Sequence, residues 1–346
     1  MPIIEVHNLR KEFRTNVRRE GRFGTLLSLV NPLSREIVAV ENVNFKVEKG
    51  ESVAYLGPNG AGKSTTIKML TGILVPSSGS VKVGGLVPYK NRKRNSYQIG
   101  VVFGQRSQLL FDLPVKDSYE LLRYMYSIPL TQYRSNLKKF TAILEVENLL
   151  DRSVRTLSLG QRMRCEILAA LLHEPEILFL DEPTIGLDVV AKERIRTFIE
   201  EINREKEVTV LLTTHDLGDI ERLCSRLIII DKGKLIYDGS LQYIKERFAT
   251  ERQLRLVMPD PVSAKQLTSQ LSTHIDLNVS TMEQVIKITY NQHKTDTAEL
   301  LRFLLEKANP SDLSMSDESI EALIRHIYQE GMGDYHLPSK MGGQKS

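Results

Sequence analysis

The stretch Gly57–Thr65, GPNGAGKST, directly follows an apolar run at Val53–Leu56. It fits the pattern G-x-x-x-x-G-K-[ST], which requires a strand before it and a helix after it. Glycine at such positions allows backbone geometry that turns successive N–H groups toward an anion. The competing interpretation is a glycine-rich turn that matches by chance. We predict a phosphate-binding loop made of Gly57, Pro58, Asn59, Gly60, Ala61, Gly62, Lys63, Ser64 and Thr65.

Two acidic residues follow another apolar run. Ile177–Leu180 is typical of a buried strand, and Asp181 and Glu182 come directly after it. Because ligands of open α/β sheets bind outside the carboxyl ends of the strands, both carboxylates are expected near the phosphate loop. Asp181 and the Ser64 hydroxyl would hold Mg²⁺, and Lys63 would reach the β- and γ-phosphates. Glu182 would polarise the attacking water. The competing interpretation is a strand end with two solvated acids.

A histidine ends a further apolar run at the same predicted sheet edge. His215 follows the run Val208–Thr213 after one intervening residue, within VTVLLTTHD. This position favours a role in sensing the γ-phosphate or in orienting the attacking water. A structural histidine is the competing interpretation.

Composition limits the classes of protein to consider. The chain has 346 residues, 41% of them hydrophobic, which suffices for one large domain and a smaller one. Its 47 basic and 43 acidic residues leave a net charge of +4, too even for whole-surface nucleic-acid binding. Cys165 and Cys224 lack metal-ligand spacing, so a reducing compartment is expected. The charged N-terminus does not resemble a signal peptide, and no apolar run reaches the length of about 20 residues that a bilayer helix needs.

Apolar runs alternate with amphipathic stretches from residue 51 onward, which predicts a mainly parallel sheet covered on both faces. Helical patterns dominate residues 106–172, and strand patterns occupy 3–13 and 37–47. The sheet runs are Val53–Leu56, Ile99–Phe103, Ile177–Leu180, Val208–Thr213 and Leu227–Ile230, with a hairpin turn near Lys232 and Gly233.

Two regions lie outside this pattern. Residues 14–36 form a basic insertion with an apolar patch. The insertion would contact anionic lipid headgroups or a partner subunit; the competing interpretation is a solvated loop. The sequence pattern of residues 249–332 predicts a small α+β accessory domain. Its strands are expected at 252–258 and 284–290 and its helices at 263–271, 296–308 and 317–329. Residues 333–346 are expected to be a disordered tail.

The stretch LSLGQRMRCEILAALL, residues 157–172, resembles the signature motif of ABC transporter ATPases, usually LSGGQ. Leu157, Ser158, Gly160 and Gln161 match, whereas Leu159 stands where the family has its first glycine. Ser158 can still cap the following helix, whose N–H groups would face an anion. The phosphate loop, glutamine loop, signature, Asp-Glu strand, GLD sequence and histidine all occur in the family's order over residues 3–248.

The resemblance implies a fold and further site residues. The expected fold is α/β, a P-loop NTPase of ABC type with an antiparallel β subdomain and a helical subdomain in residues 1–248, plus the accessory domain. Phe13 would stack on adenine, although a core phenylalanine is the competing interpretation. Gln105 would join Mg²⁺ to the transport subunit, with Gln108 as a fallback because Gly104 looks inserted. Ser158, Leu159, Gly160 and Gln161 would act on the ATP of the other subunit, and Asp188 would cross the interface.

The resemblance also implies a function. The chain is expected to be the ATP-hydrolysing motor of an ABC transporter at the cytoplasmic face of the membrane. It would pair with itself or a homologous ATPase subunit and drive membrane-spanning permease subunits, using ATP and Mg²⁺. Similarity to a bacterial exporter-type branch favours export, with import left open. A soluble ABC-type ATPase acting on the ribosome or nucleic acid is the alternative, and a P-loop kinase fits less well; no nucleic-acid partner is expected.

Overall fold

A computed structural model describes residues 1–17, 33–104, 107–248, 251–271, 277–291 and 294–317. Contacts divide the chain into two compact units, Met1–Ser240 and Leu241–Ser346. Within the described ranges, no helix is both long and apolar enough to cross a membrane.

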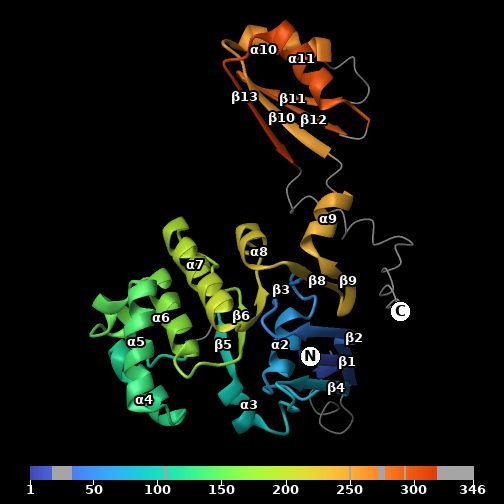
Figure 1. The fold of residues 1–346 in the computed structure, drawn as a ribbon. Coiled ribbons are helices and arrows are strands. Elements are labelled where there is room, and N and C mark those ends of the chain that lie inside the picture. Colours follow the sequence, from blue (N-terminus) through green and yellow to red (C-terminus); the bar gives the residue numbers. More distant parts are fainter. Residues whose placement is uncertain (18–32, 105–106, 249–250, 272–276, 292–293, 318–346) are drawn as a thin grey trace, which may run out of the picture. The chain divides into compact units, whose positions relative to one another are not determined.

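A six-stranded sheet forms the centre of the first unit (Figure 1). Its order is β5-β6-β7-β3-β8-β9, in which the first five strands are parallel and β9 pairs antiparallel with β8. The central strands are buried along their whole length, because helices cover both faces of a parallel sheet. The strands are β3 (Ser52–Leu56), β5 (Ile99–Phe103), β6 (Ile177–Asp181), β7 (Thr209–Thr213), β8 (Arg226–Asp231) and β9 (Lys234–Ser240).

An antiparallel sheet of order β2-β1-β4 packs on the same core. It is made of β1 (Pro2–Val17), β2 (Leu33–Glu48) and β4 (Ser78–Val83). The ladder between β1 and β2 continues to the pair Val17 and Leu33, so both ends of the basic insertion are strand. Residues 18–32, its centre, lie outside the described residues. The last buried residue of β1 is Leu9, so the apolar pattern fades toward Phe13, whereas backbone pairing needs no apolar side chain and continues to Val17.

Helices follow the strands in the order expected of crossover connections. Figure 1 shows α4, α5 and α6 grouped on the side of the six-stranded sheet away from the antiparallel sheet. Their bounds confirm a helical region within residues 106–172. The helices of this unit are α2 (Lys63–Leu70), α3 (Arg92–Gln98), α4 (Val115–Met125), α5 (Leu130–Leu144), α6 (Leu159–Leu171), α7 (Val189–Lys206) and α8 (Leu217–Leu223), with the 3₁₀ turns η1 (Glu147–Leu149) and η2 (Val154–Thr156).

The second unit begins with α9 (Leu241–Phe248), which the sequence analysis had placed at the end of the first domain. A βαββαβ sequence of elements follows, with an antiparallel sheet of order β11-β12-β10-β13. Buried leucines of α10 and α11 share a core with alternate residues of β10 and β12. The elements are β10 (Glu251–Val257), α10 (Pro261–Leu271), β11 (Leu277–Met282), β12 (Val285–Asn291), α11 (Thr297–Ala308) and β13 (Asp312–Asp317).

The α+β architecture confirms the expected class of this unit, but β11 and β13 were missed. Both are edge strands, and β11 reads LNVSTM with only partial burial on its inner side. Such half-polar edges carry a weak alternation signal. The predicted helix at 317–329 begins at Asp317, which the structure places in β13; its remaining residues and the tail at 333–346 lie outside the described residues.

An ion cluster joins the start of β3 to the β8–β9 hairpin. Arg226 donates to both oxygens of Asp238 over 2.7 and 2.9 Å and to Glu51 over 3.0 Å. Its side chain is 23% exposed, so these bonds are partly shielded from water.

We expect Arg226→Ala to lower the free energy of unfolding by about 2 kcal/mol, because two carboxylates lose charge-assisted hydrogen bonds. Urea unfolding of the full chain would measure the change. The matched control is Arg14→Ala, whose pair with Glu36 is largely exposed and should contribute about 0.5 kcal/mol or less. Equal losses in the two variants would contradict the assignment of Arg226 as a structural anchor.

Candidate functional site

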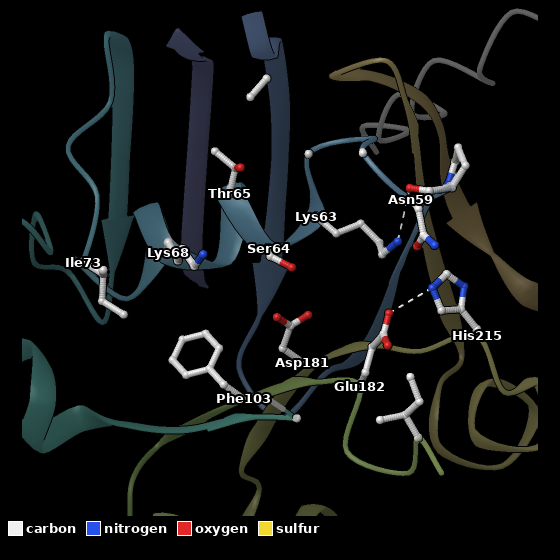
Figure 2. Close-up of a pocket in the computed structure, with 16 residues that line it drawn as sticks. Asn59, Lys63, Ser64, Thr65, Lys68, Ile73, Phe103, Asp181, Glu182 and His215 are labelled. Atoms are coloured by element: carbon white, nitrogen blue, oxygen red, sulfur yellow. Dashed lines mark hydrogen bonds and ion pairs between the residues drawn. The ribbon is translucent and has the colours of Figure 1, made fainter. Parts of the chain in front are cut away.

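A pocket of about 580 Å³ opens at the carboxyl edge of the six-stranded sheet (Figure 2). The segments that follow β3, β5, β6 and β7 all reach it, as expected where parallel strands end together. The lining residues predicted from the sequence are Pro58, Asn59, Gly60, Gly62, Lys63, Ser64, Thr65, Asp181, Glu182 and His215.

The loop between β3 and α2 has the backbone geometry that was predicted for it. Gly60 and Gly62 have φ values of 84° and 105°, which lie in the region that glycine favours. A Cβ on Gly62 would lie 2.4 Å from the Ala39 carbonyl oxygen, so β2 also excludes any side chain there. Gly57 and Ala61 belong to the loop but do not line the pocket, and Ala61 is buried.

Lys63 is held inside the loop as the first residue of α2. Its ammonium group donates to the carbonyl oxygens of Gly57 and Pro58 over 2.6 and 3.3 Å. Burial lowers the pKa of Lys63, and the nearby charges of Glu182 and Asp181 oppose that shift. The ammonium group therefore lies among backbone carbonyls and carboxylates, where an anionic group of a ligand can approach it.

Asp181 ends β6 opposite the start of α2, and Figure 2 shows its carboxylate directed toward Ser64. The Thr213 hydroxyl donates to Asp181 Oδ1 over 2.6 Å and fixes the orientation of the carboxylate. The arrangement of one carboxylate and one hydroxyl oxygen fits a small oxygen-seeking cation. In the described part of the chain, no group of three or more His, Cys, Asp or Glu gathers as a metal site, so phosphate oxygens and water would have to complete the coordination.

Glu182 adopts an unusual backbone conformation at the head of the pocket. Its φ is 56°, which is rare for a residue with a side chain, and its N–H donates to the Thr213 carbonyl over 2.9 Å. This turn brings Glu182 Oε1 to 2.9 Å from His215 Nε2, as Figure 2 shows. Strained backbone of this kind persists at functional sites. The pair joins the ends of β6 and β7 across the pocket.

A buried carboxylate supports this pair from behind. Asp219, fully buried in α8, accepts hydrogen bonds from Thr184 over 2.5 Å and Thr214 over 2.9 Å. Arg196 of α7 donates to its other oxygen over 2.7 Å. Thr184 and Thr214 lie next to the segments that carry Glu182 and His215, so the positions of the two residues are coupled.

The signature residues lie away from this pocket. None of Ser158, Leu159, Gly160 and Gln161 lines it, and neither does Asp188. Ser158 caps α6, accepting from the Gln161 N–H over 3.3 Å while its own N–H donates to the Gln161 side chain over 3.0 Å. Ser158 and Leu159 are exposed, which leaves the start of the helix open to an anion from another molecule.

The signature and the GLD segment form one surface. Asp188 caps α7 by accepting from the Ala191 N–H over 2.8 Å. A Cβ on Gly160 would lie 3.1 Å from Ala191 Cβ, so this glycine lets the starts of α6 and α7 approach closely. Leu159 is 39% exposed, and a Cβ on Gly186 would lie 3.1 Å from its Cδ2, so the glycine leaves room for this leucine beside the GLD segment.

Two predicted residues fall elsewhere. Phe13 is 38% exposed and does not line the pocket, although its ladder partner Ile37 is two residues from Ala39, which does. Lys11 Nζ lies 5.3 Å from the ring centroid of Phe13. Gln105 lies outside the described residues. Its fallback Gln108 donates to the Val101 carbonyl over 3.0 Å, turned toward β5, and does not line the pocket.

Six lining residues lie outside the set predicted from the sequence. They are Ala39, Lys68, Ile73, Phe103, Gly104 and Ile185. Lys68 lies in α2 and Ile73 follows that helix, whereas Phe103 ends β5 and Gly104 comes directly after it. Their positions, at the end of a strand of the sheet or close after the phosphate loop, could have predicted that they line the pocket. Ala39 carries no such signal, because only the fold brings β2 beside the loop.

Comparison with known proteins gives a consistent result. The family model described as "ABC transporter" matches residues 40–185. The linearmycin resistance ATP-binding protein LnrL of Bacillus subtilis is 31% identical over 293 residues, which are 83% of this chain and 93% of LnrL. The ABC transporter ATP-binding protein NatA of the same species is 32% identical, covering 62% of this chain and 87% of NatA. The Nod factor export ATP-binding protein I of Burkholderia lata is 31% identical, covering 71% and 80%.

Solved structures agree in fold. An ATP-binding subunit of an ABC transporter superposes with a TM-score of 0.59 at 26% identity, covering 71% of this chain and 93% of that chain. A dimeric bacterial ABC transporter cassette gives a TM-score of 0.57 at 28% identity, covering 69% and 98%. The mixed sheet, the antiparallel subdomain and the phosphate loop are those of an ABC-type P-loop fold. The chain therefore belongs to the ABC transporter family, as an ATP-binding subunit that hydrolyses ATP for transport.

Proposed function

We propose that two ATPase subunits, either two copies of this chain or this chain and a homologue, close around two ATP molecules and drive export through separate membrane-spanning subunits. One observation carries the proposal: Ser158 and Leu159 are exposed at the capped start of α6, and no signature residue lines the chain's own pocket. A helix N-terminus attracts anions, so its natural ligand is the nucleotide held by another subunit. Asp188 beside it would then lie at the interface.

Each pocket residue has a role in this proposal. The phosphate loop and Lys63 bind the β- and γ-phosphates, and Phe13 stacks on the adenine at the rim. Ser64 and Asp181 would hold Mg²⁺, with Gln105 as a further ligand predicted from the sequence. When bound there, Mg²⁺ would supply positive charge to neutralise the phosphates.

Hydrolysis is assigned to the pair at the end of β6 and β7. Glu182 accepts a proton from the attacking water, and His215 orients the carboxylate through the 2.9 Å contact between Nε2 and Oε1. ATP favours the closed dimer because only that state completes both pockets, and hydrolysis removes this preference. The difference in affinity supplies the energy for moving the membrane subunits.

The direction and location rest on the relatives. One of them is named for Nod factor export and another for linearmycin resistance, and both fit export. The partner would be a permease of several membrane spans, and this chain would sit peripherally at the cytoplasmic face of the membrane. Co-expression with a candidate permease tests the proposal, since a true partner co-purifies and raises ATPase activity. The proposal would be contradicted if no permease encoded beside this chain co-purified with it and raised its ATPase activity.

Glu182→Gln should lower kcat for ATP about 100-fold or more, because the amide is not a general base. ATP binding should persist, since the phosphate loop is untouched. Steady-state hydrolysis and equilibrium ATP binding by the purified chain measure the two effects. Glu147→Gln, an exposed glutamate in η1, is the matched control and should behave as the unmodified chain. Undiminished hydrolysis in Glu182→Gln would remove the catalytic assignment.

Leu159→Gly should raise ATP turnover about fivefold, equivalent to about 1 kcal/mol. The leucine side chain stands beside the exposed helix start that would receive the other subunit's nucleotide, and glycine opens that space. ATPase activity measured against protein concentration separates turnover from dimer formation. Leu130→Gly, another exposed leucine at the first position of a helix, is the control. A fall in turnover equal to that of the control would count against an interfacial Leu159.

Phe13→Ala should raise KM for ATP about tenfold with little change in kcat, because base–aromatic stacking is worth about 1–3 kcal/mol. Phe13→Tyr should retain the KM of the unmodified chain. Initial rates over a range of ATP concentrations measure both. An unchanged KM in the alanine variant would assign Phe13 to the surface of the β1–β2 hairpin instead.

A further inference from the structure

Tyr55 is a fully buried tyrosine in β3, the strand that leads into the phosphate loop. Its ring packs against Phe45 of β2, with the two ring centroids 5.7 Å apart. Its hydroxyl oxygen lies 3.2 Å from the hydroxyl oxygen of Thr66 in α2. The proposed binding and hydrolysis of ATP assign no role to this hydroxyl. Tyr55 nevertheless connects the strand before the loop to the helix after it.

The direction of the hydrogen bonds follows from the acceptor at their far end. The Thr66 hydroxyl lies 3.1 Å from the Gly62 carbonyl oxygen, which can only accept. Thr66 therefore donates its one hydroxyl proton to Gly62, and Tyr55 donates to Thr66. Burial raises the pKa of Tyr55 and the hydrogen bond to Thr66 opposes that shift, so the phenol keeps its proton at neutral pH. We call these two bonds the Tyr55–Thr66–Gly62 relay.

A fixed Gly62 carbonyl also fixes the N–H group of Lys63. The two groups belong to one planar trans peptide and point in opposite directions. Lys63 is the first residue of α2, so its N–H has no partner within the helix. The carbonyl oxygen also accepts the Thr66 N–H over 2.9 Å. Because both bonds hold the oxygen from the side of the helix, the Lys63 N–H is directed away from the helix, toward the phosphate loop.

The backbone of Gly62 needs such a restraint. Its φ of 105° lies in a region that glycine enters freely, and glycine has more conformational freedom to lose than any other residue. Gly62 is the N-cap of α2 and has no side chain with which to cap the helix. A peptide free to rotate would present its N–H to an anion for only part of the time. Holding the peptide in the binding conformation before the ligand arrives removes that cost from binding.

We propose that Tyr55 is a positioning residue for ATP, which acts through Thr66 and Gly62 to hold the Lys63 N–H toward the phosphates. This inference rests on the proposed function, because it requires the phosphate loop to be the ATP site. The phosphates contact the loop both in bound ATP and in the transition state. The relay therefore contributes to the affinity for ATP and leaves the chemical step unchanged.

The test measures KM and kcat for ATP, and equilibrium binding of the non-hydrolysable analogue AMP-PNP, in the purified full chain with Mg²⁺. Tyr55→Phe removes the first donor and should raise KM and the Kd of the analogue about threefold. Thr66→Val removes both bonds of the relay and should raise them about tenfold. In both variants kcat should change by less than about twofold. Thr66→Ser keeps a hydroxyl and should retain the KM of the unmodified chain.

A double variant and a matched control separate the relay from a general loss of packing. Tyr55→Phe with Thr66→Val should raise KM no more than Thr66→Val alone, because Tyr55 acts only through Thr66. The control is Tyr290→Phe. Tyr290 is also buried, and its hydroxyl donates to the Thr297 hydroxyl over 2.9 Å, but both residues belong to the second unit. This variant loses the same kind of hydrogen bond and should keep the KM for ATP.

A purely structural hydrogen bond in Tyr55 would lower thermal stability and the active fraction, as in Tyr290→Phe, and leave KM unchanged. An unchanged KM in both Tyr55→Phe and Thr66→Val would overturn the proposal. Additive increases of KM in the double variant would overturn it as well, and so would a fall in kcat that exceeds the rise in KM. If Thr66→Val does not fold, Tyr55→Phe, which keeps the ring and its packing, still decides the question.

Lys63→Ala distinguishes failure of this inference from failure of the proposed function. If Lys63→Ala abolishes binding of AMP-PNP while the Tyr55 and Thr66 variants keep their KM, only the relay is wrong. If Lys63→Ala binds the analogue as tightly as the unmodified chain, the phosphate loop is not the ATP site.

Discussion

Parallel pairing of β3 with β7 and of β7 with β6 is the constraint on which the site depends. Parallel strands end at one edge, so the phosphate loop, the Asp181–Glu182 turn and His215 meet there although more than 150 residues separate the first from the last. Hydrogen bonds then refine the arrangement: Thr213 orients Asp181, and the positive φ of Glu182 turns its side chain toward His215. The shared edge of the sheet brings the three segments close together, and these local contacts orient their side chains.

The site assembled in this way is one half of what the proposed reaction needs. The pocket offers the proposed reaction the Lys63 ammonium group, the Glu182 carboxylate and the oxygens of Asp181 and Ser64, but no residue of the signature lines it. The missing donors are on the same chain, at the starts of α6 and α7, where Gly160 allows the two helices to approach. In the proposed dimer, this surface covers the mouth of the other subunit's pocket and directs the start of α6 toward the nucleotide bound there. ATP would therefore favour dimerisation, because its phosphates contact both subunits.

Much of the fold and site could be predicted from the sequence because its signals are local. Uninterrupted apolar runs predicted every strand of the parallel sheet, and the glycine spacing predicted the loop geometry at Gly60 and Gly62. What escaped prediction depends on contacts between distant segments. Ala39 lines the pocket only because β2 packs on the loop, and β11 and β13 are half-polar edge strands with weak alternation. The partner of Glu166 gives no local signal in the sequence, since Gln108, whose N–H donates to its carboxylate, lies 58 residues away.

In the proposed mechanism, buried carboxylates link displacements of the segments at the nucleotide to displacements of whole helices. Asp219 joins the segments of Glu182 and His215 to α7 through Thr184, Thr214 and Arg196. The N-cap of α7 is Asp188, which lies at the interface in the proposed dimer. Each of these bonds satisfies a charge that water cannot reach, so breaking one costs more than moving the attached helix as a rigid body. A helix held by such bonds moves as a rigid body and does not unfold locally. A transport ATPase needs this property, because ATP hydrolysis must change the conformation of a partner in the membrane.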